Sequence, residues 1–118
     1  MAKILIADDS AFMRTVLKNI LMKAGFNTIL EAKDGLEAVE KYESENPDIL
    51  LLDIIMPNLD GLGVLQKLRF KKANVIVVSA VGQEKMVNEA KSLGAIDFII
   101  KPFDADNVVQ AVKKILGK

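Results

Sequence analysis

The chain has 118 residues, of which 51% are hydrophobic and 27% charged, a composition typical of one globular domain with a sizeable core. Basic and acidic residues number 16 each, so the chain has no excess positive charge for binding nucleic acid through its phosphates. Cysteine and histidine are absent, which excludes disulfides, thiol nucleophiles and the usual zinc ligands. Any bound metal would therefore be a hard ion held by oxygen atoms.

The amino terminus leads directly from Lys3 into an apolar segment, without the pattern of a signal peptide or a transmembrane run. We therefore expect a cytoplasmic protein with no membrane partner. A single domain is expected over residues 1–118, with no output domain after it.

Short apolar runs alternate with segments of helical periodicity along the whole chain. The expected strands, in chain order, are 4–7, 27–31, 49–52, 75–78 and 98–100. A helix is expected after each strand, beginning near Ser10, Asp34, Asp60, Gln83 and Asp104. The segment 27–31 is the most polar strand and is predicted at the sheet edge. In the helix that ends near Glu45, the spacing predicts Leu36, Val39 and Tyr42 on the buried side.

Strands that alternate with helices at this spacing predict right-handed crossovers and a parallel sheet covered on both faces. A closed eight-stranded barrel needs about 250 residues, so the open α/β sheet is favoured. The fold class we predict is flavodoxin-like, a doubly wound five-stranded parallel sheet in the order 2-1-3-4-5 with five helices. In this order the first and third strands are neighbours, and ligands bind where their carboxyl ends meet.

Functional groups follow the predicted strands at this edge. They are Asp8 and Asp9 after the first strand, Asp53 after the third, Ser79 after the fourth and Lys101 after the fifth. Each has an ordinary explanation alone: an aspartate caps a turn or helix, a serine forms a turn, and a lysine is solvated. Because parallel strands lie about 4.8 Å apart, however, the whole set can converge in one cleft. The joint pattern predicts a site.

Three crowded carboxylates repel one another unless cations intervene. Lys101 offsets one charge, and Mg²⁺, which needs only one or two direct carboxylates and water, offsets more. A metal ion, an ammonium and a hydroxyl that face one carboxylate favour an anion with several oxygens. The residues therefore predict a Mg²⁺ site that receives a phosphoryl group.

With these residues in place, the sequence resembles the receiver domains of two-component response regulators, and among them the chemotaxis receivers. The motifs that carry the resemblance are Asp8-Asp9, Asp53 with Met56-Pro57, Asp60-Gly61, Ser79-Ala80 and Lys101-Pro102. The resemblance covers the whole chain. It implies a stand-alone signalling protein rather than an enzyme, one that accepts a phosphoryl group from a histidine kinase.

The resemblance also implies a role for each site residue. Asp53 would be the phosphoacceptor, and Asp9, Asp53 and the backbone carbonyl of Ile55 would bind Mg²⁺, with Asp8 acting through a bound water. Lys101 would pair with the phosphoryl oxygens.

Ser79 and Phe98 would form the switch of the family, in which the hydroxyl moves toward the phosphoryl group and the aromatic ring turns inward. The surface of helix 83–93, strand 98–100 and the last helix would then bind a flagellar or archaellar motor switch or an adaptor protein. A monomer is expected.

The sequence departs from the family at four positions. Ser79 replaces a common threonine, and Phe98 replaces a common tyrosine, so a phenolic hydrogen bond cannot stabilise the active form. Ile55 and Val81 are aliphatic where many receivers are polar. We hypothesise that water is then poorly positioned for attack and that self-dephosphorylation is slow.

Four other functions share part of this pattern. A receiver that relays phosphate in another two-component pathway shares every motif and stays open. An FMN-binding module is disfavoured because Asp8 and Asp9 would repel the cofactor phosphate. A Mg²⁺-dependent aspartyl phosphohydrolase needs a general acid two residues after Asp53, where Ile55 stands. A dinucleotide-binding fold is excluded because Gly61 and Gly63 lack a third spaced glycine.

Overall fold

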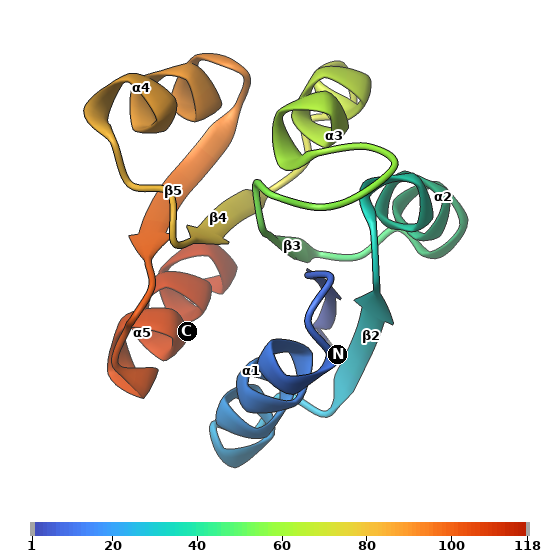
Figure 1. Ribbon diagram of the computed structural model, residues 1–118. Helices are drawn as coiled ribbons and strands as arrows, with labels where there is room; N and C mark the ends of the chain where they lie inside the picture. The colour runs from blue at the N-terminus through green and yellow to red at the C-terminus, as the bar shows by residue number, and fades with distance from the viewer. Residues whose placement is uncertain (1, 118) are drawn as a thin grey trace.

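The computed structural model describes residues 2–117, over which strands and helices alternate along the chain (Figure 1). The strands are β1 (Lys3–Ala7), β2 (Thr28–Ala32), β3 (Ile49–Leu52), β4 (Val75–Ser79) and β5 (Ala95–Ile100). The helices are α1 (Ala11–Lys23), α2 (Gly35–Glu45), α3 (Gly61–Leu68), α4 (Glu84–Ser92) and α5 (Ala105–Leu116). Every predicted element is present, and β5 begins three residues before the predicted Phe98.

The strands form one parallel sheet in the order β2-β1-β3-β4-β5, which confirms the predicted fold class and places β2 at an edge. In the register of the sheet, Ala7 of β1 lies opposite Leu52 of β3. Each is the last residue of its strand, so Asp8 and Asp53 follow at the same level of the sheet. The topology therefore brings the predicted acidic residues together.

Helices cover both faces of the sheet: α1 and α5 lie on one side, and α2, α3 and α4 on the other (Figure 1). Each layer has its own apolar core, because side chains of successive strand residues point to opposite faces. Leu5, Leu50 and Leu52 belong to the core under α2 to α4, whereas Ile4 and Leu51 belong to the core under α1 and α5. All four residues of β3 are buried, as expected for a central parallel strand.

Polar side chains fix the start of the helices that lead away from the functional edge. Ser10 caps α1 by accepting a hydrogen bond from the Met13 N–H at 3.2 Å, as its sequence position predicted. Asp60 caps α3 in the same way, accepting from the Gly63 N–H at 2.8 Å. These caps hold the loops after β1 and β3 against the first turn of the following helix.

One predicted core position was wrong. Leu36 is 54% exposed, and the residues of α2 that are buried against the sheet are Gly35, Ala38 and Tyr42. The helix begins at Gly35, and residues three and seven positions later lie on the same face as this first residue. Leu36 lies one position further round the helix and therefore points away from the sheet.

No helix over residues 2–117 is long and apolar enough to cross a membrane.

We predict that Gly61→Ala destabilises the protein by about 1–3 kcal/mol, whereas Gly63→Ala has a much smaller effect. A methyl group on Gly61 would overlap the backbone carbonyl of Asp53 and lie 2.7 Å from the Ile54 Cα, and this backbone cannot move aside without displacing β3. A methyl group on Gly63 would meet the Leu59 side chain and, at 3.3 Å, a carboxylate oxygen of Asp60, and these are side-chain atoms that can move by a change of rotamer. Urea denaturation of both variants measures the difference, and equal losses would contradict it.

Candidate functional site

Asp53 lies directly after β3, with its carboxylate at the carboxyl edge of the sheet. Its backbone N–H donates to the Ala7 carbonyl at 2.9 Å, which ties it to the end of β1. One carboxylate oxygen accepts a hydrogen bond from the Ile54 N–H at 2.7 Å. Asp53 is 8% exposed, so the carboxylate is held rigidly and still has access to solvent.

Asp8 and Asp9 follow β1 and have opposite surroundings. Asp8 is 2% exposed, and one of its carboxylate oxygens accepts a hydrogen bond from the Ser10 N–H at 2.9 Å. Asp9 is exposed. The two residues therefore give the site one inner and one outer carboxylate.

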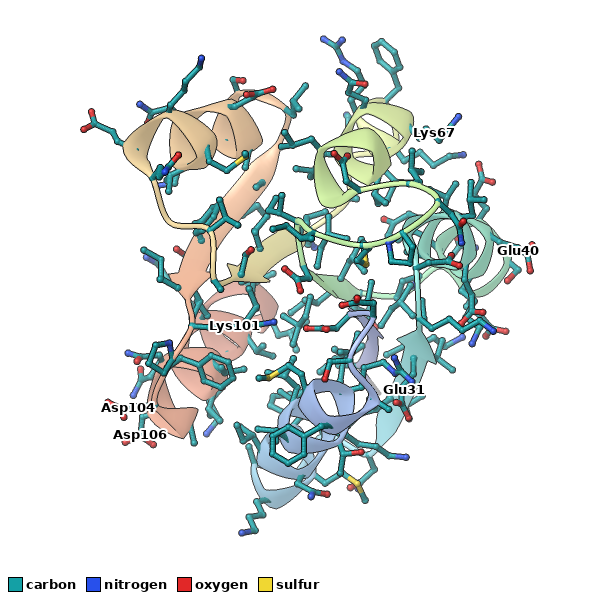
Figure 2. All side chains as sticks on the ribbon, in the orientation of Figure 1. Glu31, Glu40, Lys67, Lys101, Asp104 and Asp106 are labelled. Carbon is teal, nitrogen blue, oxygen red and sulfur yellow. The ribbon has the colours of Figure 1, made fainter. Side chains whose placement is uncertain are left out.

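Lys101 lies directly after β5 and connects the two buried acids. Its ammonium group donates to Asp8 at 2.8 Å and to Asp53 at 3.2 Å. Figure 2 shows the labelled Lys101 side chain near the end of β5, close to α5. Its backbone N–H donates to the Ser79 carbonyl at 2.9 Å, so the ends of β4 and β5 are also joined.

The pKa of Lys101 is raised above its ordinary value. Partial burial by itself lowers this pKa, but the hydrogen bond to Asp8 and the negative charge of Asp53 outweigh the burial. Lys101 is therefore fully charged at neutral pH.

The acidic cluster has the donor set of a hard-metal site. Asp8, Asp9 and Asp53 each offer a carboxylate oxygen, and these atoms lie within 4.8 Å of one another. Three carboxylates and one ammonium leave a local charge of minus two, which a divalent cation would balance. Three carboxylate oxygens this close together suit Mg²⁺, whereas Zn²⁺ prefers nitrogen and sulfur ligands.

The remaining predicted site residues are Ser79, Ile55 and Phe98, and they have different surroundings. Ser79 is buried at the end of β4, and its hydroxyl accepts a hydrogen bond from the Val81 N–H at 3.2 Å. Ile55, two residues after Asp53, is 63% exposed. Phe98 is half-buried in β5, where it pairs with Val77 and packs against the core under α2 to α4. Phe98 therefore belongs to the sheet rather than to the acidic cluster.

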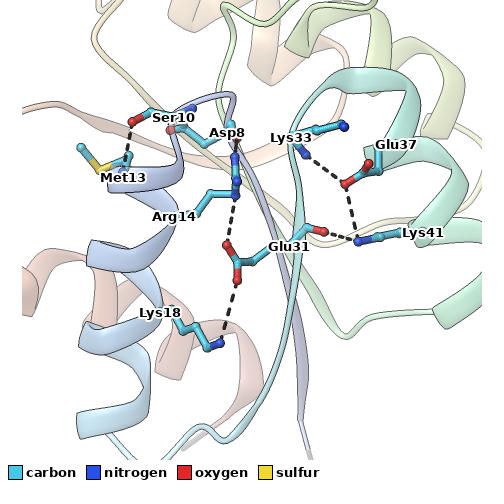
Figure 3. Close-up of polar contacts among 9 residues, drawn as sticks. All are labelled: Asp8, Ser10, Met13, Arg14, Lys18, Glu31, Lys33, Glu37 and Lys41. Atoms are coloured by element: carbon cyan, nitrogen blue, oxygen red, sulfur yellow. Dashed lines mark hydrogen bonds and ion pairs between the residues drawn. The ribbon is translucent and has the colours of Figure 1, made fainter.

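Arg14 supports the site, and the sequence analysis did not predict this role. Figure 3 shows the arginine between α1 and β2: it donates to the backbone carbonyl of Asp8 at 2.7 Å and to the Glu31 carboxylate at 3.0 Å. Lys18 lies 3.9 Å from the other Glu31 oxygen. The partners of Arg14 are Asp8, directly after β1, and Glu31 of β2, so no local spacing in the sequence marks it.

A second contact that the sequence analysis did not predict, between Asn58 and Asp34, holds the loop after β3. The Asn58 side chain donates to Asp34 at 2.8 Å, which connects this loop to the start of α2. A backbone hydrogen bond from Glu37 and the contact with Asn58 lower the pKa of Asp34 below its ordinary value. Asp34 is therefore ionised at neutral pH and serves both elements as an acceptor.

Comparison with known proteins agrees with this geometry. The sequence profile of the response regulator receiver domain matches residues 4–113. The chain belongs to this family. Receiver domains are signalling proteins, and the acidic edge described above is the part of the domain at which members of the family bind Mg²⁺.

Several relatives of this receiver domain are chemotaxis proteins. It is 51% identical to the chemotaxis protein CheY of Listeria monocytogenes, over 97% of this chain and 98% of the relative. It is 47% identical to CheY of Bacillus subtilis, over 98% of each chain. The receiver domain is therefore closely related to CheY, which supports a response regulator of the chemotaxis type.

The fold also matches solved structures. CheY in the crystal structure of the CheX–CheY–BeF₃–Mg²⁺ complex from Borrelia burgdorferi superposes with a TM-score of 0.92 and is 43% identical. The match covers 99% of this chain and 90% of the other. The response regulator domain of Thermotoga maritima CheB gives a TM-score of 0.84 at 38% identity, over 99% of this chain and 95% of that one.

We predict that Arg14→Met destabilises the protein by about 1.5–3 kcal/mol, because it removes a charged hydrogen bond to the Asp8 carbonyl and one to Glu31. Lys18→Met is the matched control, since Lys18 contacts the same glutamate from a more exposed position. Its loss should be less than about 1 kcal/mol. Denaturant midpoints measure both, and a larger loss for Lys18→Met would refute the role of Arg14.

Proposed function

We propose that this receiver domain accepts a phosphoryl group on Asp53 from a phosphohistidine of a partner kinase and acts as a stand-alone chemotaxis response regulator. The observation that carries the proposal is the ammonium of Lys101, which lies 3.2 Å from Asp53 and 2.8 Å from Asp8 inside an acidic cluster. Close relationship to CheY supports the chemotaxis assignment.

The surroundings of the three carboxylates favour Asp53 as the acceptor. Asp8 is 2% exposed against 8% for Asp53, and its contact with the Lys101 ammonium is the shorter of the two, 2.8 Å against 3.2 Å. Asp9 is exposed and forms no salt bridge within residues 2–117. Asp53 combines access to solvent with the ammonium, so an anion bound there would meet a positive charge.

In the proposed reaction, a carboxylate oxygen of Asp53 attacks phosphorus in line with the phosphorus–nitrogen bond of the donor. A phosphorus–oxygen bond forms, and the electron pair of the breaking bond returns to the imidazole of the donor. Lys101 turns from the carboxylates toward the phosphoryl oxygens and neutralises part of their charge. This chain needs no histidine of its own, because the donor supplies it.

Asp9, Asp53 and the Ile55 carbonyl would hold Mg²⁺, with Asp8 bound through water. The metal supplies positive charge to the phosphoryl oxygens when it is present. The local charge of minus two in the acidic cluster supports this assignment.

The output would depend on Ser79 and Phe98. A phosphoryl group on Asp53 adds negative charge and acceptor oxygens near the end of β4, and the Ser79 hydroxyl would leave Val81 to donate to it. Movement of the loop after β4 would let the half-buried Phe98 turn inward and change the surface of α4, β5 and α5. A flagellar or archaellar motor switch or an adaptor protein would bind there.

A phosphate relay in another pathway is the second candidate. The chain is 40% identical to sporulation initiation phosphotransferase F of Bacillus subtilis, over 97% of its length. Transfer of the phosphoryl group onward to a second histidine protein, without binding to a motor or adaptor protein, would favour the relay. A monomer in the cytoplasm is the predicted form in either case.

We predict that acetyl phosphate with Mg²⁺ adds one phosphoryl group to the wild-type protein and none to Asp53→Asn. Intact-protein mass spectrometry measures the product. Asp106→Asn changes an exposed aspartate of α5 in the same way and should label normally. Chelation of Mg²⁺ by EDTA should abolish labelling of the wild type. Full labelling of Asp53→Asn would overturn the proposal.

We predict that the acyl phosphate is long-lived and that Ile55→Asn shortens its lifetime several-fold. Ile55 is exposed beside the site but offers no hydrogen bond to an attacking water, whereas an amide would orient one. Loss of label after removal of the donor measures the rate. Leu36→Asn makes the same change at an exposed leucine of α2 and should leave the rate unchanged. A fast rate in the wild type that Ile55→Asn does not alter would discard this explanation.

A further inference from the structure

The turn between α3 and β4 carries a concentration of positive charge that the phosphoryl-transfer site does not use. We call residues 67–72 the basic turn; its cations are Lys67, Arg69, Lys71 and Lys72. No acidic residue occurs between Asp60 and Glu84, although acidic and basic residues balance over the whole chain. Lys71 forms an exposed ion pair with Glu43 at 3.6 Å. Over residues 2–117, the other three cations form no ion pair.

An aromatic ring projects from the middle of the basic turn. Phe70 is 88% exposed, more than any other large hydrophobic side chain over residues 2–117. The guanidinium carbon of Arg69 lies 5.1 Å from the centre of its ring, so the cation stacks on the ring. The turn has a defined backbone, because the Lys71 N–H donates to the Leu68 carbonyl at 2.9 Å and Lys72 adopts a left-handed conformation with φ of 53°. Phe70 is thus presented on an ordered turn.

A small hollow of about 80 Å³ opens next to the basic turn. Leu65, Leu68 and Val75, all buried core residues, line it together with residues at the end of α4. Arg69 and Lys72 of the basic turn also line this hollow. The volume corresponds to two or three water molecules, which is enough for part of one aliphatic side chain.

The hollow lies at the opposite end of the sheet from the acidic cluster. Val75 is the first residue of β4 and lines the hollow, whereas Ser79 is the last and adjoins Lys101. In Figure 2, Lys67 on α3 and Lys101 at the acidic cluster are well separated. A partner at the basic turn would therefore leave the acidic cluster open.

We propose that the basic turn and its hollow form a docking site for an acidic protein segment in which one aliphatic side chain is flanked by carboxylates. The aliphatic side chain would enter the hollow, and the carboxylates would pair with Arg69 and Lys72, which line it. The exposed ring of Phe70, between these two cations in the sequence, would pack against another part of the segment. Charge complementarity selects an acidic partner. The hollow favours a peptide over a lipid surface, because only one aromatic side chain projects and a hollow offers nothing to insert into a bilayer.

The test is a titration of the ¹⁵N-labelled full-length chain with a blocked synthetic peptide, Glu-Glu-Leu-Asp-Glu, followed by amide chemical shifts. We expect shifts that saturate and are confined to residues 65–75 and 93–94, with weaker binding as salt rises. A neutral peptide, Gln-Gln-Leu-Asn-Gln, should bind at least tenfold more weakly.

Two exposed positions of the basic turn separate the contributions. Phe70→Ala should weaken peptide binding several-fold, and Lys72→Glu should weaken it more than tenfold. Met22→Ala and Lys23→Glu change an exposed apolar residue and a cation on α1, and both should bind like the wild type. All four variants should retain the mass gain from acetyl phosphate on Asp53, which shows that the fold is intact and separates this proposal from the proposed phosphorylation.

Three results would overturn the docking site: no saturable binding, shifts centred on other residues, or equal binding by Lys72→Glu and the wild type. Vesicles that contain phosphatidylserine test the alternative that the basic turn binds a membrane. Sedimentation of the chain with these vesicles, lost in Phe70→Ala and without any binding of the acidic peptide, would assign the basic turn to a membrane and refute a protein partner.

Discussion

The contact between the Lys101 ammonium and the carboxylates of Asp8 and Asp53 is the interaction on which the site depends. Without a cation between them, two nearly buried carboxylates at neighbouring strand ends would repel each other. The ammonium contacts both carboxylates, and these contacts raise its pKa above the ordinary value despite its partial burial. Because three strands contribute these groups, the charge balance of the site also joins β1, β3 and β5 at their carboxyl ends.

The sheet determines where the acidic residues lie, and residues outside the site hold them there. The acidic residues follow β1, which is buried from Ile4 onward, and β3, which is buried throughout, so their backbone has little freedom to shift. Arg14 fixes the carbonyl of Asp8, and Asn58 fixes the loop after β3 to Asp34. The acidic cluster is thus part of a connected network that extends to α1 and α2, rather than a set of independent side chains.

Much of the fold and of the acidic site could be predicted because the sequence patterns that indicate them involve neighbouring residues. Buried strands such as Ile49–Leu52, the cap at Ser10 and the strand-end positions of Asp8, Asp53 and Lys101 follow from neighbouring residues and topology. Arg14 and Asn58 could not be predicted, since their partners depend on how distant elements pack. Leu36 was misplaced because the large apolar residues at 36, 39 and 42 marked the buried side in the sequence, whereas the structure buries the small residues Gly35 and Ala38 together with Tyr42.

The placement of the basic turn and the acidic cluster at opposite ends of β4 has one more consequence. Five residues of strand span about 16 Å, so the two ends are far enough apart for separate proteins to occupy them together. A tether at Phe70 would raise the local concentration of this chain near a chosen assembly while its chemistry runs unhindered at the other end. Location and timing of the signal would then be set by different surfaces of one small domain.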